Sequence, residues 1–536
     1  MATLIYNAHI YLERGRFAEA ILIDDGLVKA VGTLEEVSAA APADAERWDA
    51  RGRTVVPGFN DSHQHLFNTG IALADVRLHT ARSIADVKRL TLEYIEKHRP
   101  TPGSVLHGMG WNHDYFTDEH RMLTRHDLDD ITTDYPLVFE RACGHVLTAN
   151  TAALRLAGVT RDTVAPEGGA IDRDPDGEPN GIIRENARPQ VRAILGKHDV
   201  DDTEKLLRIA MAHAAETGVT SVQTNDLRGG SWETVLEAYN RTQLNPTVRV
   251  YHQVNFPNPE DYRAFLERGY TTNRGTPFHR FGPLKLFVDG SLGARTALLR
   301  RPYADDPTTK GIATLTPEQI EAFVSTAVEF GCSVAIHAIG DGAVENVLNC
   351  YENYCPDGTN PLRLGIVHCQ ITDAEQIERF RRSDILALVQ PIFLHYDMQI
   401  CEDRVGPELT ATSYAFGTMV KKGIHTSFGT DSPIEDMAPL DNLYCAVTRK
   451  NLRGEPEGGW LPGEKIDIYD AVDCYTLESA YASFEENVKG RLFPGYYADL
   501  VVLSEDIFTN PEVTLRTAKV DATMVGGRFV YEREGA

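Results

Sequence analysis

The sequence has few cysteines and no long apolar run. Its eight cysteines in 536 residues are scattered, and none forms a CxxC pair. This pattern favours buried thiols over a disulfide framework. No stretch of about 18 consecutive apolar residues is present, so no transmembrane helix is expected. The N-terminal segment MATLIYNAHIYLERGRFAEA lacks the apolar core of a signal peptide, which predicts a cytoplasmic protein.

Basic residues are also fewer than acidic ones, which argues against nucleic acids and anionic membranes as partners. The chain has 53 Lys and Arg against 78 Asp and Glu, giving a formal net charge of −25, and no local cluster of Lys and Arg offsets it. Such a surface repels nucleic-acid phosphates and anionic lipid headgroups. The expected partner is therefore a small molecule, with no nucleic acid and no membrane, and a homodimer is left open.

Short apolar runs alternate with amphipathic segments through the middle of the chain. The runs are TVVPGFNDSH, GVTSVQTND, TVRVYHQVNF, GPLKLFVDGS, CSVAIHAIGD, LRLGIVHCQ, ILALVQPIF and IHTSFGTDSP. Strands that alternate with helices indicate a parallel sheet, and eight such units fit a closed (β/α)8 TIM barrel of the α/β class. The first and second runs are separated by about 150 residues, too many for one loop. This gap predicts a large insertion after the first barrel strand, at about 67–200.

Both ends of the chain are rich in strand-forming residues. Residues 1–55 and 487–536 contain segments such as AEAILIDDGLVKAVG and ADLVVLSED, and neither end alone has enough apolar surface for a core. We therefore expect a small composite β-sandwich domain built from both termini, with the barrel domain at 56–486.

Polar residues lie at or near the ends of several predicted strands. In a barrel the carboxyl ends of the strands gather at one mouth, and the alternation of a strand places His63 and His65 on the same face. The groups expected at the mouth are, in chain order, His63, His65, Lys285, His337, His368 and Asp431. Any one of these residues, taken alone, could have a purely structural role, such as packing, hydrogen bonding or helix capping. Imidazole nitrogen and carboxylate oxygen suit zinc and similar divalent ions, so their joint order predicts a metal site.

Lys285 differs from the other groups, because a protonated ammonium cannot ligate a cation. Burial near metal ions lowers the pKa of a lysine, and the neutral amine can then add carbon dioxide. The resulting carbamate is an anionic oxygen ligand that can bridge two ions. The alternative is an uncarboxylated Lys285 beside a single ion.

Six stretches together resemble a known family. They are PGFNDSHQHL, RACGHVLTAN, LKLFVDGSLGARTALL, IHAIGDGAVENVL, VHCQ and FGTDSPIEDMAPL. Their order resembles the amidohydrolase superfamily of metal-dependent hydrolases across nearly the whole chain, and within it the branch that contains N-substituted formamide deformylases. The resemblance implies one or two divalent ions, with zinc expected. The implied metal ligands are His63, His65, Lys285, His337 and His368, and Asp431 is implied to contact the metal as the acid and base.

The resemblance implies hydrolysis of a carbon–nitrogen bond in an amide that is not a peptide, with an N-substituted formamide as one such substrate. Metal coordination lowers the pKa of water from about 16 towards 7. The hydroxide attacks the carbonyl carbon, and Asp431 passes the proton to the departing nitrogen.

Two alternative functions stay open at this point. One is a deaminase acting on a cyclic amidine. It is disfavoured because HAIGD lacks the glutamate that related deaminases carry shortly after the fifth-strand histidine. The other is a metal-binding barrel without turnover that acts as a binding or regulatory protein.

Three further residues are candidate substrate contacts. His145, in CGHVLTAN, lies in the insert and either hydrogen-bonds the substrate carbonyl or is a structural histidine in a turn. Asp289 and Arg295, in VDGSLGARTALL, follow the strand of Lys285 on a loop that faces the mouth. They either contact polar groups of the substrate or pair with each other.

Overall fold

The computed structural model describes residues 2–141, 146–196 and 198–535. The chain divides into two compact units, each of which is described by itself. The first combines Met1–Asn68 with Ala210–Ala536, and the second is the insert Thr69–Ile209. Every helix among the described residues is too short or too polar to span a bilayer.

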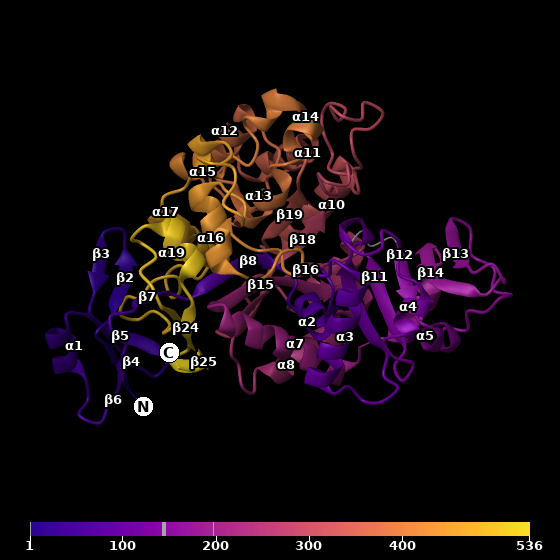
Figure 1. The fold of residues 1–536 in the computed structure, drawn as a ribbon. Coiled ribbons are helices and arrows are strands. Elements are labelled where there is room, and N and C mark those ends of the chain that lie inside the picture. The colour runs from indigo at the N-terminus through magenta and orange to yellow at the C-terminus, as the bar shows by residue number, and fades with distance from the viewer. Residues whose placement is uncertain (1, 142–145, 197, 536) are drawn as a thin grey trace. The chain divides into compact units, whose positions relative to one another are not determined.

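The first unit contains a nearly closed barrel of eight parallel strands, which confirms the predicted α/β barrel (Figure 1). Each of the eight apolar runs supplies one strand of the barrel, and β22 lies against β8 where the ends of the sheet meet. In order around the barrel the strands are β8 (Phe59–Gln64), β15 (Val219–Arg228), β16 (Arg249–Asn255), β18 (His279–Phe287), β19 (Val334–Ala338), β20 (Gly365–His368), β21 (Leu386–Val389) and β22 (Thr426–Phe428).

Helices connect the barrel strands and continue after the last of them. They are α8 (Trp232–Thr242), α9 (Pro259–Glu267), α10 (Pro317–Glu329), α11 (Asp341–Tyr351), α12 (Ala374–Arg382), α13 (Leu394–Asp397), α14 (Cys401–Thr410), α15 (Phe416–Lys421), α16 (Pro439–Thr448), α17 (Ile468–Tyr475), α18 (Leu477–Ala482) and α19 (Pro511–Thr517). In such a barrel, the helices that connect successive parallel strands cover the outside. The functional site lies at the carboxyl ends of the strands.

The helix α12 shows how the local sequence sets these elements. Asp373 caps its N-terminus by accepting a hydrogen bond from the backbone of Gln376, whose side chain returns the bond in a capping box. Ile377 and Phe380 form its buried face. Three arginines occupy its last turn, where positive charge is favoured by the helix dipole. The next strand begins only four residues after this helix ends.

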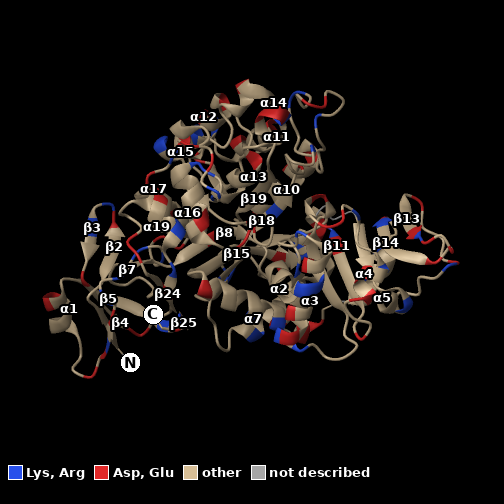
Figure 2. Ribbon diagram, viewed as in Figure 1, with Lys and Arg blue, Asp and Glu red and all other residues tan. Residues whose placement is uncertain are grey.

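Charged residues of both signs are spread along the elements of the two units (Figure 2). Many arginines pair with carboxylates on other segments: Arg363 lies 2.8 Å from Glu486, and Arg379 lies 2.8 Å from Glu352. The acidic excess of the sequence therefore leaves most guanidinium groups with a nearby carboxylate.

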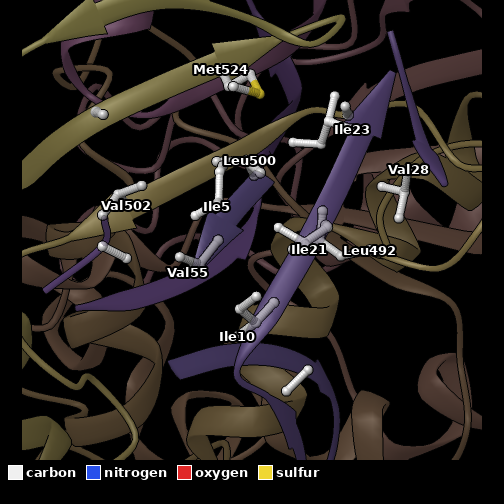
Figure 3. Close-up of a cluster of buried hydrophobic side chains, with 14 of the residues drawn as sticks. Ile5, Ile10, Ile21, Ile23, Val28, Val55, Leu492, Leu500, Val502 and Met524 are labelled. Carbon is white, nitrogen blue, oxygen red and sulfur yellow. The ribbon is translucent and has the colours of Figure 1, made fainter. Parts of the chain in front are cut away.

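The ends of the chain form two further sheets of the first unit: a six-stranded sheet with strands from both ends, and a four-stranded sheet with N-terminal strands alone. The six-stranded sheet has the order β25 (Arg528–Glu532), β24 (Val520–Val525), β23 (Leu500–Leu503), β7 (Thr54–Pro57), β2 (His9–Glu13) and β3 (Arg16–Ala18). The four-stranded sheet has the order β5 (Leu27–Gly32), β4 (Ala20–Asp24), β1 (Thr3–Tyr6) and β6 (Glu46–Asp49). Val55 is opposite Val502 in the ladder that joins the two ends of the chain. Their side chains belong to one apolar core with Ile5, Ile21 and Met524 (Figure 3).

The second unit is built around a separate six-stranded sheet. Its strands, in order, are β13 (Gly169–Arg173), β14 (Pro179–Glu185), β12 (Val146–Ala149), β11 (Leu137–Arg141), β10 (Leu106–Trp111) and β9 (Val76–Arg77). Its helices include α3 (Ile84–His98), α4 (Arg125–Asp129), α5 (Thr151–Leu156) and α6 (Arg188–Arg192), while α2 (Leu66–Ala74) and α7 (Val200–Glu216) run across the unit boundaries. Two apolar cores, one around Trp111 and one around Leu147, hold this unit together.

A buried ion pair joins the barrel to the terminal sheets within the first unit. Arg249, the first residue of β16, donates to Asp499 from Nε at 2.6 Å and from Nη2 at 3.0 Å, and both side chains are buried. Replacing Arg249 with methionine would leave the carboxylate of Asp499 buried and unpaired. We expect a loss of about 3–5 kcal/mol in the free energy of unfolding, measured by urea denaturation.

The matched control for this prediction is Arg263→Met. Arg263 pairs with Glu329 at 2.6 Å on the surface of the same unit, and the expected loss is below about 1 kcal/mol. An Arg249→Met variant that is no less stable than this control would contradict the prediction.

Candidate metal centre

The first and last strands of the barrel bring two histidines and an aspartate together. His63 and His65 lie at the carboxyl end of β8, with ring centroids 5.3 Å apart. Asp431 follows β22, and its Oδ1 lies 3.4 Å from His63 Nε2 and 3.1 Å from His65 Nε2. The backbone fixes this approach, because Asp431 N donates to His63 O at 2.8 Å and His65 N donates to Ser432 O at 2.8 Å. All three residues are buried.

Asp61, two residues before the first histidine, holds the turn that carries Asp431. Its carboxylate accepts hydrogen bonds from Thr430 Oγ1 at 2.6 Å, Thr430 N at 3.1 Å and His63 N at 3.3 Å. Gly429 is required at the same point, since a Cβ there would lie 2.7 Å from His63 N. Burial raises the pKa of Asp61 to about 7, against the hydrogen bonds from Thr430 that favour the ionised form. Asp61 is therefore a structural support of the site.

His368 and His337 lie beside this group. The ring of His368, at the end of β20, is 5.9 Å from that of His63 and 4.4 Å from that of His337. His337 Nε2 faces the loop after β18, 3.1 Å from Gly290 O and 3.3 Å from Asp289 Oδ1. The four histidines therefore form one continuous cluster at the carboxyl ends of β8, β19 and β20.

Two glutamines orient the inner histidines. His63 Nδ1 lies 2.6 Å from Gln253 Oε1, and His368 Nδ1 lies 2.7 Å from Gln390 Oε1. Because an amide oxygen only accepts hydrogen bonds, Nδ1 carries the proton in both rings and Nε2 keeps its lone pair. This is the tautomer that a metal-ligating histidine needs, and an oxygen partner on the other nitrogen is usual at such sites.

Lys285 is completely buried two residues before the end of β18. Its Nζ lies 3.7 Å from the centre of the Phe287 ring and donates to Leu286 O at 3.4 Å. Burial lowers the pKa of Lys285 to about 7, so the neutral amine is readily formed at neutral pH. A neutral amine is the species that can react with carbon dioxide.

The electrostatics of the cluster favour neutral His63 and His368 and an ionised Asp431. Burial and then the charge of Lys285 lower the pKa of His63 well below its ordinary value, and burial does the same for His368. Burial alone would favour protonated Asp431, but the combined attraction of His65, His63 and His368 outweighs it and holds the pKa of Asp431 below its ordinary range.

The donor atoms fit a divalent cation. The ligating atoms of His63, His65 and Asp431 lie within 4.8 Å of one another, and His63 Nε2 and Asp431 Oδ1 are buried without a hydrogen-bond partner among the described residues. Buried polar atoms are nearly always satisfied. A cation between them would satisfy both.

Comparison with known proteins identifies the family. The sequence profile of the amidohydrolase family matches residues 46–531. The chain belongs to the amidohydrolase family. This amidohydrolase is 33% identical to the YtcJ protein of Bacillus subtilis over 99% of its own length and 100% of that protein. It is 28% identical to the N-substituted formamide deformylase of Arthrobacter pascens over 99% of each chain.

A solved structure extends the comparison to the fold. The amidohydrolase superimposes on an uncharacterized metal-dependent hydrolase from Pyrococcus horikoshii with a TM-score of 0.78 and 29% identity, covering 96% of this chain and 99% of that one. Together with the His-His-Asp group, these similarities make the amidohydrolase a metal-dependent hydrolase of that family.

The structure shows the partners of Arg295 and Asp289, in the loop after β18 of the amidohydrolase. Arg295 pairs with Asp305, at 2.8 Å, so the alternative in which it pairs with Asp289 is wrong. Asp289 is buried and accepts hydrogen bonds from the backbone of Leu298, Ile339 and Gly340. It thereby ties the loop after β18 to the end of β19. His145 lies outside the described residues.

The sequence analysis did not predict three residues that lie in the site. Gln253 and Gln390 are isolated polar residues within or just after apolar strands, as the runs VYHQVNF and LALVQPIF show. That isolation is a usable signal, because a buried amide needs a partner. The third is Arg228, at the end of β15, whose Nη2 lies 2.9 Å from His65 Nδ1.

Proposed function

We propose that the amidohydrolase hydrolyses the carbon–nitrogen bond of a small non-peptide amide, with N-substituted formamides as the leading class. The observation that carries the proposal is the placement of Asp431 Oδ1 within 3.4 Å of two buried histidine nitrogens. Similarity to the formamide deformylase over 99% of each chain supports the substrate class.

The residues that would hold the metal follow from the cluster. They are His63, His65, His337, His368 and Asp431, with Lys285 as a further ligand when it is carboxylated. Nitrogen and carboxylate donors make zinc the leading candidate. When bound, such an ion lowers the pKa of a coordinated water and polarises a carbonyl oxygen.

Asp431 would move the proton in the reaction. Its ionised carboxylate accepts a proton from the attacking water and delivers it to the amide nitrogen, since an amine leaves poorly as an anion. Gln253 and Gln390 hold His63 and His368 in one tautomer and one orientation throughout. Lys285, as the neutral amine, forms a nitrogen–carbon bond to carbon dioxide and releases a proton to give the carbamate.

Metal removal tests the proposal directly. Metal content of the purified protein is measured, and release of amine and of formate or other acid is assayed on formamides, longer acyl amides and cyclic amidines. We expect amine release from an amide that falls at least about 100-fold after chelation and returns when zinc is added. Ammonia release from amidines only, or full metal content with no turnover on any compound, would contradict the proposed function.

A further inference from the structure

Arg228 lies at the barrel mouth next to the metal centre. It is the last residue of β15, the strand that pairs with β8. Its Nη2 is 2.9 Å from His65 Nδ1, its Nε donates to Asn225 O at 3.1 Å, and its guanidinium carbon is 5.8 Å from the centre of the Phe287 ring. The guanidinium thus lies between His65 and the ring against which Lys285 packs.

This arginine has no carboxylate partner in the part of the chain that the structure describes. Its neighbours there are a ring nitrogen, a backbone oxygen and an aromatic ring. Of the buried arginines elsewhere in the unit, Arg249 and Arg379 pair with carboxylates, whereas Arg449 donates to backbone oxygens. A partly buried guanidinium without a counter-ion is costly to maintain, and in a chain of net charge −25 a missing carboxylate at the mouth points to an anion supplied by the ligand.

The hydrogen-bond donors and acceptors around His65 also indicate that Arg228 binds a group of the ligand. A neutral imidazole donates from one nitrogen and accepts at the other. When Nε2 ligates a metal, Nδ1 must carry the proton, and Asn225 O at 3.3 Å is its acceptor. Nδ1 then cannot accept from Arg228, so the metal-loaded site leaves the Nη2 donor of Arg228 available for another acceptor.

We propose that Arg228 binds a carboxylate of the substrate, so that the amides hydrolysed here carry a negative charge near the scissile bond. A guanidinium offers two parallel donors that match the two oxygens of a carboxylate. The proposal rests on the proposed amide hydrolysis and assigns its substrate class. In it Arg228 is a specificity-determining residue.

The test uses the zinc-loaded full chain and matched pairs of amides. The acidic probes are N-formylglycine, N-formyl-β-alanine and N-formyl-4-aminobutyrate, which place the carboxylate at increasing distance from the amide. The neutral probe is N-formyl-4-methylpentylamine, which has an isopropyl group in place of the carboxylate of the longest acid. We expect wild type to prefer at least one acid over the neutral probe.

The variant Arg228→Gln isolates the guanidinium. We expect kcat/KM for the preferred acid to fall about 10- to 100-fold, mainly through a higher KM, because one charge-assisted contact is lost. For the neutral probe kcat/KM stays within about threefold, and zinc content is unchanged. Arg228→Lys keeps the charge and is expected to fall between wild type and Arg228→Gln. Arg263→Gln, on the exposed Arg263–Glu329 pair, is the control and keeps both activities.

Two results would overturn this inference. One is a wild type that hydrolyses amides with no preference for an acid. The other is an Arg228→Gln variant that loses the same factor on acid and neutral probes or loses zinc, because Arg228 would then act only through His65 or the Lys285 carbamate.

A binding measurement separates failure of this inference from failure of the proposed function. Calorimetry of glutarate binding to zinc-loaded wild type and Arg228→Gln needs no turnover. Glutarate binding that weakens at least about 10-fold in the variant supports the anion site even if no amide is hydrolysed. Equal binding to both proteins overturns it.

Discussion

Replacing Asp431 with asparagine is expected to lower kcat by about 100- to 10,000-fold on any amide that the wild type hydrolyses. The substitution keeps the shape of the side chain and removes its ability to accept a proton, and loss of a positioned general base costs a factor of this size. Asparagine also suits the backbone, because φ at this position is +56° and asparagine tolerates that conformation better than most residues. The measurement is steady-state amine release together with zinc content.

The matched control is Asp441→Asn. Asp441 lies in α16 and pairs with Arg516 at 2.6 Å at the protein surface, so its loss is expected to change kcat by less than about twofold. If the Asp431→Asn variant retained zinc and kept kcat within about tenfold of wild type, Asp431 would not be the proton carrier.

Replacing Lys285 with methionine is expected to stabilise the metal-free protein at pH 6 while abolishing hydrolysis. Burial lowers the pKa of Lys285 from 10.5 to about 7. Below pH 7 Lys285 is charged in both the folded and the unfolded state. The folded state then bears the full free-energy cost of burying that charge, at most about 5 kcal/mol. Between pH 7 and 10.5 the folded state has lost a proton that the unfolded state keeps, so wild-type stability rises with pH. Above 10.5 both states are neutral, and the penalty disappears.

The advantage of the methionine variant should therefore shrink steadily between pH 7 and 10.5. Urea unfolding of both proteins, in chelator and in buffer free of carbon dioxide, measures this difference. Lys489→Met is the control with the opposite expected result. The Nζ of buried Lys489 lies 2.6 Å from Glu485. Removing it destabilises the protein, because the carboxylate of Glu485 loses a partner. A Lys285→Met variant that is less stable than wild type at pH 6, or a difference that does not change with pH, would refute the prediction.

The same variant separates the two states of Lys285 in the metal-loaded enzyme. Zinc-loaded wild type prepared in ¹³C-bicarbonate should show the carbon resonance of a carbamate, and Lys285→Met should not. Absence of that resonance from active wild type would favour the uncarboxylated lysine beside a single ion.

Much of the barrel could be predicted because its signals are local. Each strand is a short apolar run of residues adjacent in the chain, and strand alternation alone puts His63 and His65 on one face. The supports of these residues are not local. Gln253 reaches His63 across 190 residues, and Asp61 reaches Thr430 across 369, so no spacing in the sequence relates them.

The sequence by itself determined the strand order of the barrel, the polar residues at the strand ends and the types of atom available to a metal. Only the tertiary structure decided which of those atoms meet, that Arg295 pairs with Asp305, and that Arg228 has no carboxylate beside it among the residues that the structure describes. The physical reason is that side-chain chemistry and periodicity are properties of short segments. Contact, burial and the pKa of a lysine such as Lys285 depend on groups that come together only when distant strands close into a barrel.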